Sequence, residues 1–205
     1  MATKKITLSS VIANINAFAL VIITEVVAIV KEYAKSKDCG KYGNIFETVV
    51  NAIITCVASH RKPATMHDVF ILGDKEKHNY SIECKTNCGM LVNGLSKEQA
   101  ELMVNDVNAI TKAIHASFIC YCPMFRKPID LYNARVLYTR DFVKLLNEYK
   151  LLRVKKQSNG SYCIAIQNYL PTENFTGLRR GQDFLEKFYK YQTLEKFAVK
   201  YAVKE

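Results

Sequence analysis

The sequence predicts an α/β protein with a mixed central β-sheet flanked by helices. Strand-like runs alternate with helical runs along the chain, and the first two strands are joined by a short polar turn. Apolar residues make up 49% of the 205 positions, which is enough for one substantial core with or without a small appendage.

Two helices are expected near the N-terminus. The first runs from about Ser9 to Lys35, and its apolar stretch Val11–Val30 has nearly the length of a membrane span. Glu25 would then lie inside the hydrocarbon, at a cost of about 3 kcal/mol, so we expect a helix that packs on protein or forms a dimer interface. The second runs from about Asn44 to Ser59, with an apolar stripe at helical spacing made of Phe46, Val49, Val50, Ile53, Ile54 and Val57.

Two strands and a third helix are expected in the middle of the chain. Asp68–Leu72 and Tyr80–Thr86 have strand character, and the polar stretch Gly73–Asn79 joins them as a turn. A glycine-containing loop then leads to Ser96. Ser96-x-x-Gln99 is a capping box that starts a helix to about Ala113.

The remaining elements are expected after that helix. Two strands come first, Ala116–Cys122, which Pro123 ends, and Arg135–Tyr138. A helix capped by Thr139 follows through Leu152, then a hairpin of Arg153–Gln157 and Tyr162–Gln167, and finally a basic amphipathic helix from Gly181. We divide the chain into 1–40 for packing or dimerisation, a core over 41–152, and a hairpin and basic helix over 153–205.

Charge and cysteine content narrow the class of partners. A net charge of +10 favours nucleic acid first and an anionic membrane second.

The seven cysteines are odd in number, scattered and without a C-x-x-C pair, which argues against a disulfide framework and a structural zinc site. Cys120 and Cys122 alternate in an apolar strand, so both thiols are expected on one buried face. We therefore expect a reducing, intracellular (cytoplasmic) location.

The predicted hairpin brings acidic and basic residues together. A turn centred between Lys75 and Glu76 pairs residues whose numbers add to 151, which puts Asp68 opposite Glu83. Lys85 lies two residues further on and shares the face of Glu83.

Two carboxylates on neighbouring strands are a hard-oxygen site for Mg²⁺ or Mn²⁺. We expect Asp68, Glu83 and the carbonyl of Cys84 as metal ligands, and Lys85 to hold the attacking water or the developing charge on phosphorus. Asp74 is excluded because it lies in the turn, about 20 Å from Glu83 at strand rise. The alternative is an ordinary cross-strand ion pair on a surface hairpin.

Asp68 followed by Glu83-x-Lys85 on the next strand resembles the signature of the restriction-endonuclease-like, or PD-(D/E)XK, nuclease superfamily. The resemblance covers about residues 41–152 and implies a restriction-endonuclease-like core. Gly43-x-x-x-Glu47 resembles the first core helix of that family, which implies that Glu47 is a further catalytic or metal-associated carboxylate; a solvent-facing glutamate is the alternative. Gln99 resembles a glutamine that some members place near the site, although capping Ser96 explains it equally well.

Two features of the chain differ from those of some family members. His67 stands where many members have proline. Some relatives hold an iron–sulfur cluster with four cysteines, three of them near the C-terminus; only Cys163 follows residue 122 here, so no cluster is expected.

The resemblance implies a metal-dependent DNA endonuclease acting on phosphodiester bonds. A type II restriction enzyme is our first expectation, and a Holliday-junction resolvase or viral repair or recombination nuclease is the alternative. A virus- or plasmid-encoded enzyme is compatible with either expectation, and the N-terminal helix suits a homodimer. Candidate DNA contacts are His67, Thr86, Asn87, Asn93, Lys97, Gln99, Arg126, Lys127, Arg140, Lys155, Lys156, Arg179 and Arg180.

Two other classes stay open. Thr139–Leu152 with the following hairpin resembles the helix and wing of a winged-helix module, which would make the chain a non-catalytic DNA-binding protein. A membrane-anchored structural protein would depend on residues 11–30.

Overall fold

The computed structural model describes residues 43, 45–47, 49–51, 54, 69–71, 80–125, 128–169 and 179–200. The predicted helix from Ser9 to Lys35 and the predicted turn Gly73–Asn79 lie outside the described residues. Four candidate site residues also lie outside them: His67, Asp68, Arg126 and Lys127.

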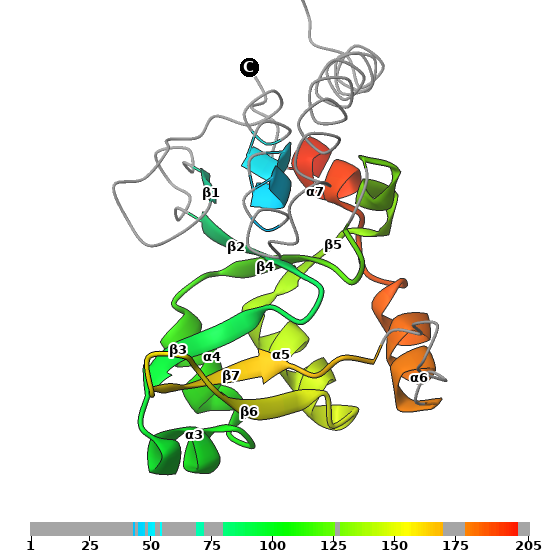
Figure 1. Cartoon of the computed structure of the whole chain (residues 1–205). Helices are drawn as coiled ribbons and strands as arrows, with labels where there is room; N and C mark the ends of the chain where they lie inside the picture. The colour runs from blue at the N-terminus through cyan, green and yellow to red at the C-terminus, as the bar shows by residue number, and fades with distance from the viewer. Residues whose placement is uncertain are drawn as a thin grey trace, which may run out of the picture.

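A four-stranded mixed sheet forms the centre of the molecule (Figure 1). Its strand order is β1 (Val69–Ile71), β2 (Tyr80–Thr86), β4 (Phe118–Cys122) and β5 (Arg135–Tyr138). β2 and β4 are parallel and the other two pairs are antiparallel. A parallel pair needs a long crossover, which here contains the helices α3 (Lys97–Met103) and α4 (Val107–Ile114). The predicted α/β class with a mixed sheet is confirmed.

A second, three-stranded sheet was not predicted. It has the order β3 (Met90–Leu95), β7 (Tyr162–Ile166) and β6 (Leu152–Lys156). The predicted β6–β7 hairpin is confirmed, but the predicted loop before Ser96 is wrong because it contains β3. Asn93 and Gly94 weaken the local strand pattern, and two register shifts interrupt the pairing of β3 with β7. Tertiary pairing with a strand some 70 residues away therefore creates this element.

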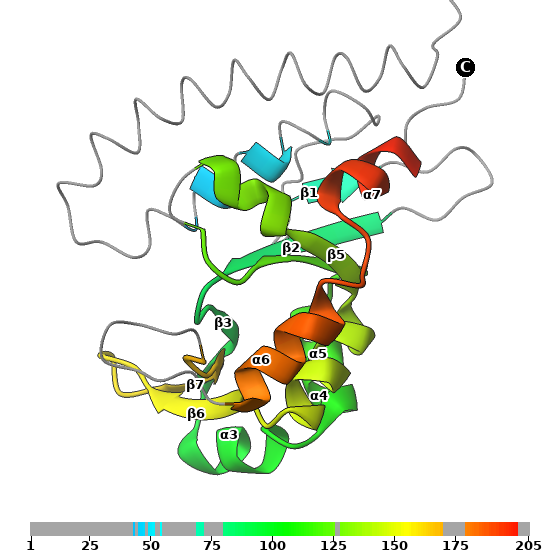
Figure 2. The same cartoon turned by 90° about the vertical axis from the view of Figure 1, so that its right-hand side faces the viewer.

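Each face of the central sheet supports its own core (Figure 2). On one face, Ile82, Cys84, Cys120 and Cys122 pack with α7 (Leu194–Lys200) and with the buried helical residues Ile45, Phe46, Val49, Val50 and Ile54. On the other face, Ile119, Tyr121 and Leu137 pack with α4, α5 (Thr139–Glu148), α6 (Arg179–Phe188) and the second sheet. The buried stripe of the second predicted helix and the shared buried face of Cys120 and Cys122 are thus confirmed for the described residues.

Three predicted helices have different limits in the structure. The run from Ser96 to Ala113 is two helices, because Asp106 caps α4 by accepting from the amides of Asn108 and Ala109 at 2.9 and 3.0 Å. The C-terminal helix is also two, α6 and α7, and Thr193 between them forms an isolated bridge with Arg135.

The helix predicted from Thr139 through Leu152 ends at Glu148. Thr139 is buried and does not cap it, because its hydroxyl donates to the carbonyl of Ala116 at 2.5 Å. A 3-10 helix, η1 (Pro128–Asn133), precedes β5. In the part of the chain that the structure describes, no helix has the length and apolar character needed to cross a membrane.

Candidate active site on strand β2

Glu83 and Lys85 project from the same face of β2 and contact each other. The ammonium Nζ of Lys85 lies 2.5 Å from Oε1 of Glu83. The side chains are only 17% and 19% exposed, respectively. A carboxylate withdrawn this far from water needs a compensating cation, and the ammonium of Lys85 supplies it.

The surroundings of this pair are apolar. Glu83 is in register with Ile119 of β4 and Lys85 is in register with Tyr121, and both neighbours are fully buried. Cys84, between the two charges, points to the opposite core. The pair therefore borders the hydrophobic core at the edge of a sheet face, unlike the exposed ion pairs Lys97–Glu101 and Lys187–Glu148.

The predicted pairing of β1 with β2 is confirmed wherever the structure describes both strands. The partners are Val69 with Ile82, Phe70 with Ser81, and Ile71 with Tyr80, and each pair of numbers adds to 151. Asp68 lies outside the described residues, so its position opposite Glu83 stays a prediction.

The main chain of Cys84 faces the β1 side of β2. The amide of Ser81 points to β4, where it donates to Oγ of Ser117 at 3.4 Å, and the amide of Asn87 donates to the carbonyl of Cys122 at 3.1 Å. Since main-chain groups alternate along a strand, the amide and carbonyl of Cys84 point the other way, toward β1. This direction suits the predicted role of the Cys84 carbonyl, which itself stays a prediction.

A tight turn follows Lys85 and holds the end of β2. Asn87 adopts a left-handed conformation with φ of 50°, and the amide of Gly89 donates to the carbonyl of Thr86 at 3.0 Å. A Cβ on Gly89 would lie 3.2 Å from that carbonyl and 3.4 Å from Cδ of Lys85. The glycine therefore lets the turn close against the aliphatic part of Lys85.

Two buried tyrosines support this turn. The hydroxyl of Tyr121 donates to the carbonyl of Asn87 at 2.8 Å and lies 2.9 Å from the hydroxyl of Tyr169. Because Tyr121 donates to Asn87, Tyr169 is the donor between the hydroxyls. Burial raises the pKa of both hydroxyls well above the ordinary tyrosine value, so both stay protonated. Sequence reasoning missed this network, since no local pattern connects residues 48 positions apart.

Glu47 lies on a different side of the sheet from Glu83. Its helix packs through Phe46, Val49 and Val50 on the face that carries Cys84, whereas Glu83 projects from the opposite face. Glu47 itself is partly buried. The helix therefore does not bring Glu47 onto the face of the Glu83–Lys85 pair, and its catalytic role stays a prediction.

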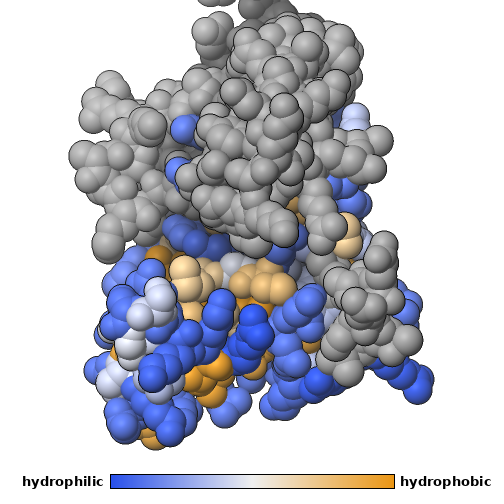
Figure 3. Space-filling model, in the orientation of Figure 1, coloured by the Kyte–Doolittle hydropathy of each residue, from blue (hydrophilic) through white to orange (hydrophobic). Residues whose placement is uncertain are grey.

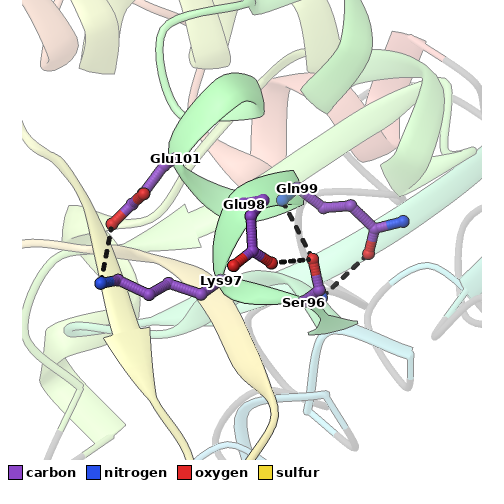
Figure 4. Close-up of polar contacts among 5 residues, drawn as sticks. All are labelled: Ser96, Lys97, Glu98, Gln99 and Glu101. Carbon is purple, nitrogen blue, oxygen red and sulfur yellow. Dashed lines mark hydrogen bonds and ion pairs between the residues drawn. The ribbon is translucent and has the colours of Figure 1, made fainter.

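Gln99 is engaged in the predicted capping box (Figure 4). Its side-chain oxygen accepts from the amide of Ser96 at 2.9 Å, and its own amide donates to the Ser96 hydroxyl at 3.2 Å. That hydroxyl also donates to Glu98 at 2.9 Å, and the pKa of Glu98 is lowered by a backbone hydrogen bond and by Ser96. The capping function of Gln99 is confirmed, and a contact of Gln99 with DNA stays a prediction.

The other candidate DNA contacts come from separate elements. Thr86 and Asn87 lie at the end of β2 beside Lys85 and are partly buried. The remaining described candidates are exposed, on β3, at the N-terminus of α3, at the N-terminus of α5, on β6 and at the N-terminus of α6: Asn93, Lys97, Arg140, Lys155, Lys156, Arg179 and Arg180.

The oxygen donors of β2 fit a hard divalent cation. They are the Glu83 carboxylate and the Cys84 carbonyl, the donor types that Mg²⁺ and Mn²⁺ prefer. Among the described residues, no group of three or more histidine, cysteine, aspartate or glutamate side chains could hold a metal ion. Asp68, the third predicted ligand, lies outside that part.

No family model matches this chain, and neither the curated proteins nor the solved structures contain a significant match to it.

Proposed function

We propose that the chain is a metal-dependent DNA endonuclease that hydrolyses phosphodiester bonds, with Asp68, Glu83 and Lys85 at its active site. One observation supports this most strongly: a carboxylate and an ammonium 2.5 Å apart on one strand face, both mostly withdrawn from water beside a hydrophobic core. An ion pair that only aided solubility would be expected at an exposed position.

Each residue has a distinct part in the proposal. The proposal places Asp68 opposite Glu83, one pair beyond the observed β1–β2 register, where Asp68, Glu83 and the Cys84 carbonyl would hold Mg²⁺ or Mn²⁺. The metal, when bound, polarises a phosphate oxygen and lowers the pKa of a bound water. Lys85 would leave Glu83 to hold the attacking water or to stabilise charge on the reacting phosphate. Its stem packs against Gly89, which limits the positions of its ammonium.

The order of elements also supports a restriction-endonuclease-like core. A helix bearing Glu47 precedes the β1–β2 hairpin, and helix α4, strands β4 and β5 and helix α5 follow it. We favour restriction of duplex DNA as the biological role, with junction resolution or viral DNA repair as the alternative. A homodimer is part of this proposal, since a palindromic site is cut by two related subunits.

Cleavage assays test the proposal directly. Supercoiled plasmid, linear duplex and four-way junction DNA are incubated with Mg²⁺, Mn²⁺ or EDTA. Wild type, Glu83→Ala and Lys85→Ala are compared with Lys97→Ala, which disrupts an exposed ion pair with Glu101. We expect metal-dependent cutting that only the Glu83 and Lys85 substitutions abolish. Absence of cutting on every substrate by a folded wild-type protein would refute the proposal.

A non-catalytic DNA-binding protein is the second candidate. It is favoured by helix α5, which is followed after three residues by the basic β6–β7 hairpin, the arrangement of a helix and its wing. This candidate predicts salt-sensitive binding to duplex DNA that needs no metal and is unchanged by Asp68→Asn. The nuclease proposal predicts that the same substitution abolishes cleavage.

A further inference from the structure

The β6–β7 hairpin concentrates positive charge. Residues 150–169 contain Lys150, Arg153, Lys155 and Lys156 and no acidic residue. The chain as a whole carries 19 acidic residues, so a stretch of this length that contains none of them has a local surplus of positive charge.

Strand pairing divides the hairpin into an inner and an outer face. Leu152 pairs with Ile166 and Val154 pairs with Ile164, and both partners belong to the core that α4 and α5 share. Arg153 and Lys155 alternate with these residues and therefore project from the other face. Their partners there, Ala165 and Cys163, have small side chains.

On the outer face the cations of β6 are exposed, whereas their β7 partners Cys163 and Ala165 are buried. Figures 1 and 2 show α4 and α5 behind this sheet, and Figure 3 shows hydrophilic residues beside a hydrophobic strip on the side turned to the viewer. Arg153 and Lys155 are exposed there, and Lys156, which by the same alternation lies on the other face at the end of β6, is exposed as well. Within the described residues, no carboxylate pairs with any of the three, whereas Lys187 is paired with Glu148 at 2.8 Å.

Hydrogen bonds hold the tip of the hairpin in one shape. The amide of Gln157 donates to the carbonyl of Ser161 at 2.8 Å, and the amide of Gly160 donates to the carbonyl of Gln157 at 3.1 Å. The amide of Ser161 donates to Oδ1 of Asn159 at 3.1 Å. An ordered turn loses little conformational entropy when its flanking cations bind a ligand.

A chain of contacts connects the hairpin to the candidate active site. Nε2 of Gln157 lies 3.2 Å from the sulfur of Met90, which follows Gly89. Gly89 packs against Lys85, and its carbonyl accepts from the amide of Ile166 at 3.1 Å. Arg153 pairs with Ala165, the residue next to Ile166. Both ends of the hairpin thus reach the segment that closes over Lys85.

We propose that the β6–β7 hairpin clamps the phosphate backbone of duplex DNA beside the Glu83–Lys85 pair, through Arg153 and Lys155 on its outer face. The choice of DNA as the anionic partner rests on the proposed nuclease function. Arg153 and Lys155 are about 6.7 Å apart along the strand, close to two axial steps of one DNA strand at about 3.4 Å each. The clamp reads no base; it fixes the position of the duplex along the site.

Duplex binding without cleavage tests this inference. Anisotropy of a labelled duplex is measured in EDTA over a range of salt concentrations. The double variant Arg153→Gln, Lys155→Gln is compared with Lys112→Gln, Lys190→Gln, which removes the same charge from exposed lysines outside the hairpin. Circular dichroism confirms that both variants are folded.

We expect the hairpin variant to lose about two units of the slope of log K against log salt, because each of the two phosphate contacts contributes about 0.9. The control variant should keep nearly the wild-type slope. Equal slopes for wild type and the hairpin variant, or equal losses in both variants, would overturn the clamp. Binding of the wild type to phosphatidylserine vesicles but not to duplex would also overturn it.

The two proposals fail in different ways. If the wild type cleaves DNA and the hairpin variant binds and cleaves normally, the clamp is refuted and the nuclease proposal stands. A wild type that never cleaves, with a hairpin variant that has lost its salt-dependent binding, removes the nuclease and leaves the clamp.

Discussion

The hydroxyl of Tyr121 donates a hydrogen bond to the main-chain carbonyl of Asn87 at 2.8 Å. Tyr121 is fully buried in β4, and Asn87 is the left-handed residue that ends β2. The bond therefore joins the parallel neighbour of β2 to the turn that closes over Lys85. Residues that never touch a substrate can position the Lys85 ammonium through this turn.

Tyr121→Phe tests the contribution of that bond. The substitution leaves the Asn87 carbonyl and the Tyr169 hydroxyl without their partner, at a cost of about 1–3 kcal/mol. Urea unfolding measures the loss. Tyr169→Phe is the control, because it keeps the bond to Asn87; its loss should be smaller. Equal effects of the two substitutions would show that the contact with Asn87 contributes nothing of its own.

Gly181→Ala tests the packing behind the same network. A Cβ at this position would lie 2.8 Å from the carbonyl oxygen of Tyr169 and 2.9 Å from its Cβ, and the main chain of one partner must move. Overpacking costs roughly 1–3 kcal/mol, more than the gain of up to about 1 kcal/mol from replacing a helical glycine. We expect a lower melting temperature.

Gly43→Ala is the matched control, because a Cβ on that helical glycine would meet nothing within 4 Å. It should leave stability unchanged or raise it by up to about 1 kcal/mol. A stabilising effect of Gly181→Ala would contradict the tight contact with Tyr169.

Burial of Cys122 predicts a loss of stability in alkali. Burial raises the pKa of this thiol from 9.0 to about 12. The folded state therefore holds the thiol proton more tightly than the unfolded state. The contribution of this proton to the free energy of unfolding is fully present below pH 9.0 and is lost between pH 9.0 and about 12. From pH 9 to 10, the free energy of unfolding of the wild type should fall by about 1 kcal/mol more than that of Cys122→Ala, as measured by urea unfolding. Parallel losses in the two proteins would contradict this assignment.

The sequence predicted the elements whose signals are local. The β1–β2 register followed from the length of the turn, and with it the shared face of Glu83 and Lys85. Strand β3 was missed because its pairing with β7 is distant in the chain. Thr139 was taken for a helix cap, but its hydroxyl bonds to Ala116, 23 residues earlier, once β4 and β5 pair.

The supports of the candidate site depend on such distant contacts. Tyr169 contacts the hydroxyl of Tyr121 and lies close against Gly181 of α6, and no spacing in the sequence reveals this geometry. The charged pair was predictable because strand alternation fixes neighbours two residues apart. Glu47 was not, because which sheet face a helix covers is decided by tertiary packing.

Metal binding by Lys85→Met separates the binding of a cation from catalysis. In the structure the Lys85 ammonium forms an ion pair with the Glu83 carboxylate, so a divalent cation that binds this carboxylate must displace the ammonium. In Lys85→Met no side-chain ammonium at this position competes with the metal for the Glu83 carboxylate. A partly exposed ion pair is worth up to about 1 kcal/mol, which corresponds to affinity for Mn²⁺ up to about fivefold higher. The rise in melting temperature with Mn²⁺ concentration measures this affinity.

Lys85→Met should therefore bind Mn²⁺ at least as well as wild type and still fail to cleave DNA, whereas Glu83→Gln should lose both properties. Weaker Mn²⁺ binding by Lys85→Met would show that the lysine supports the metal site rather than competing with it.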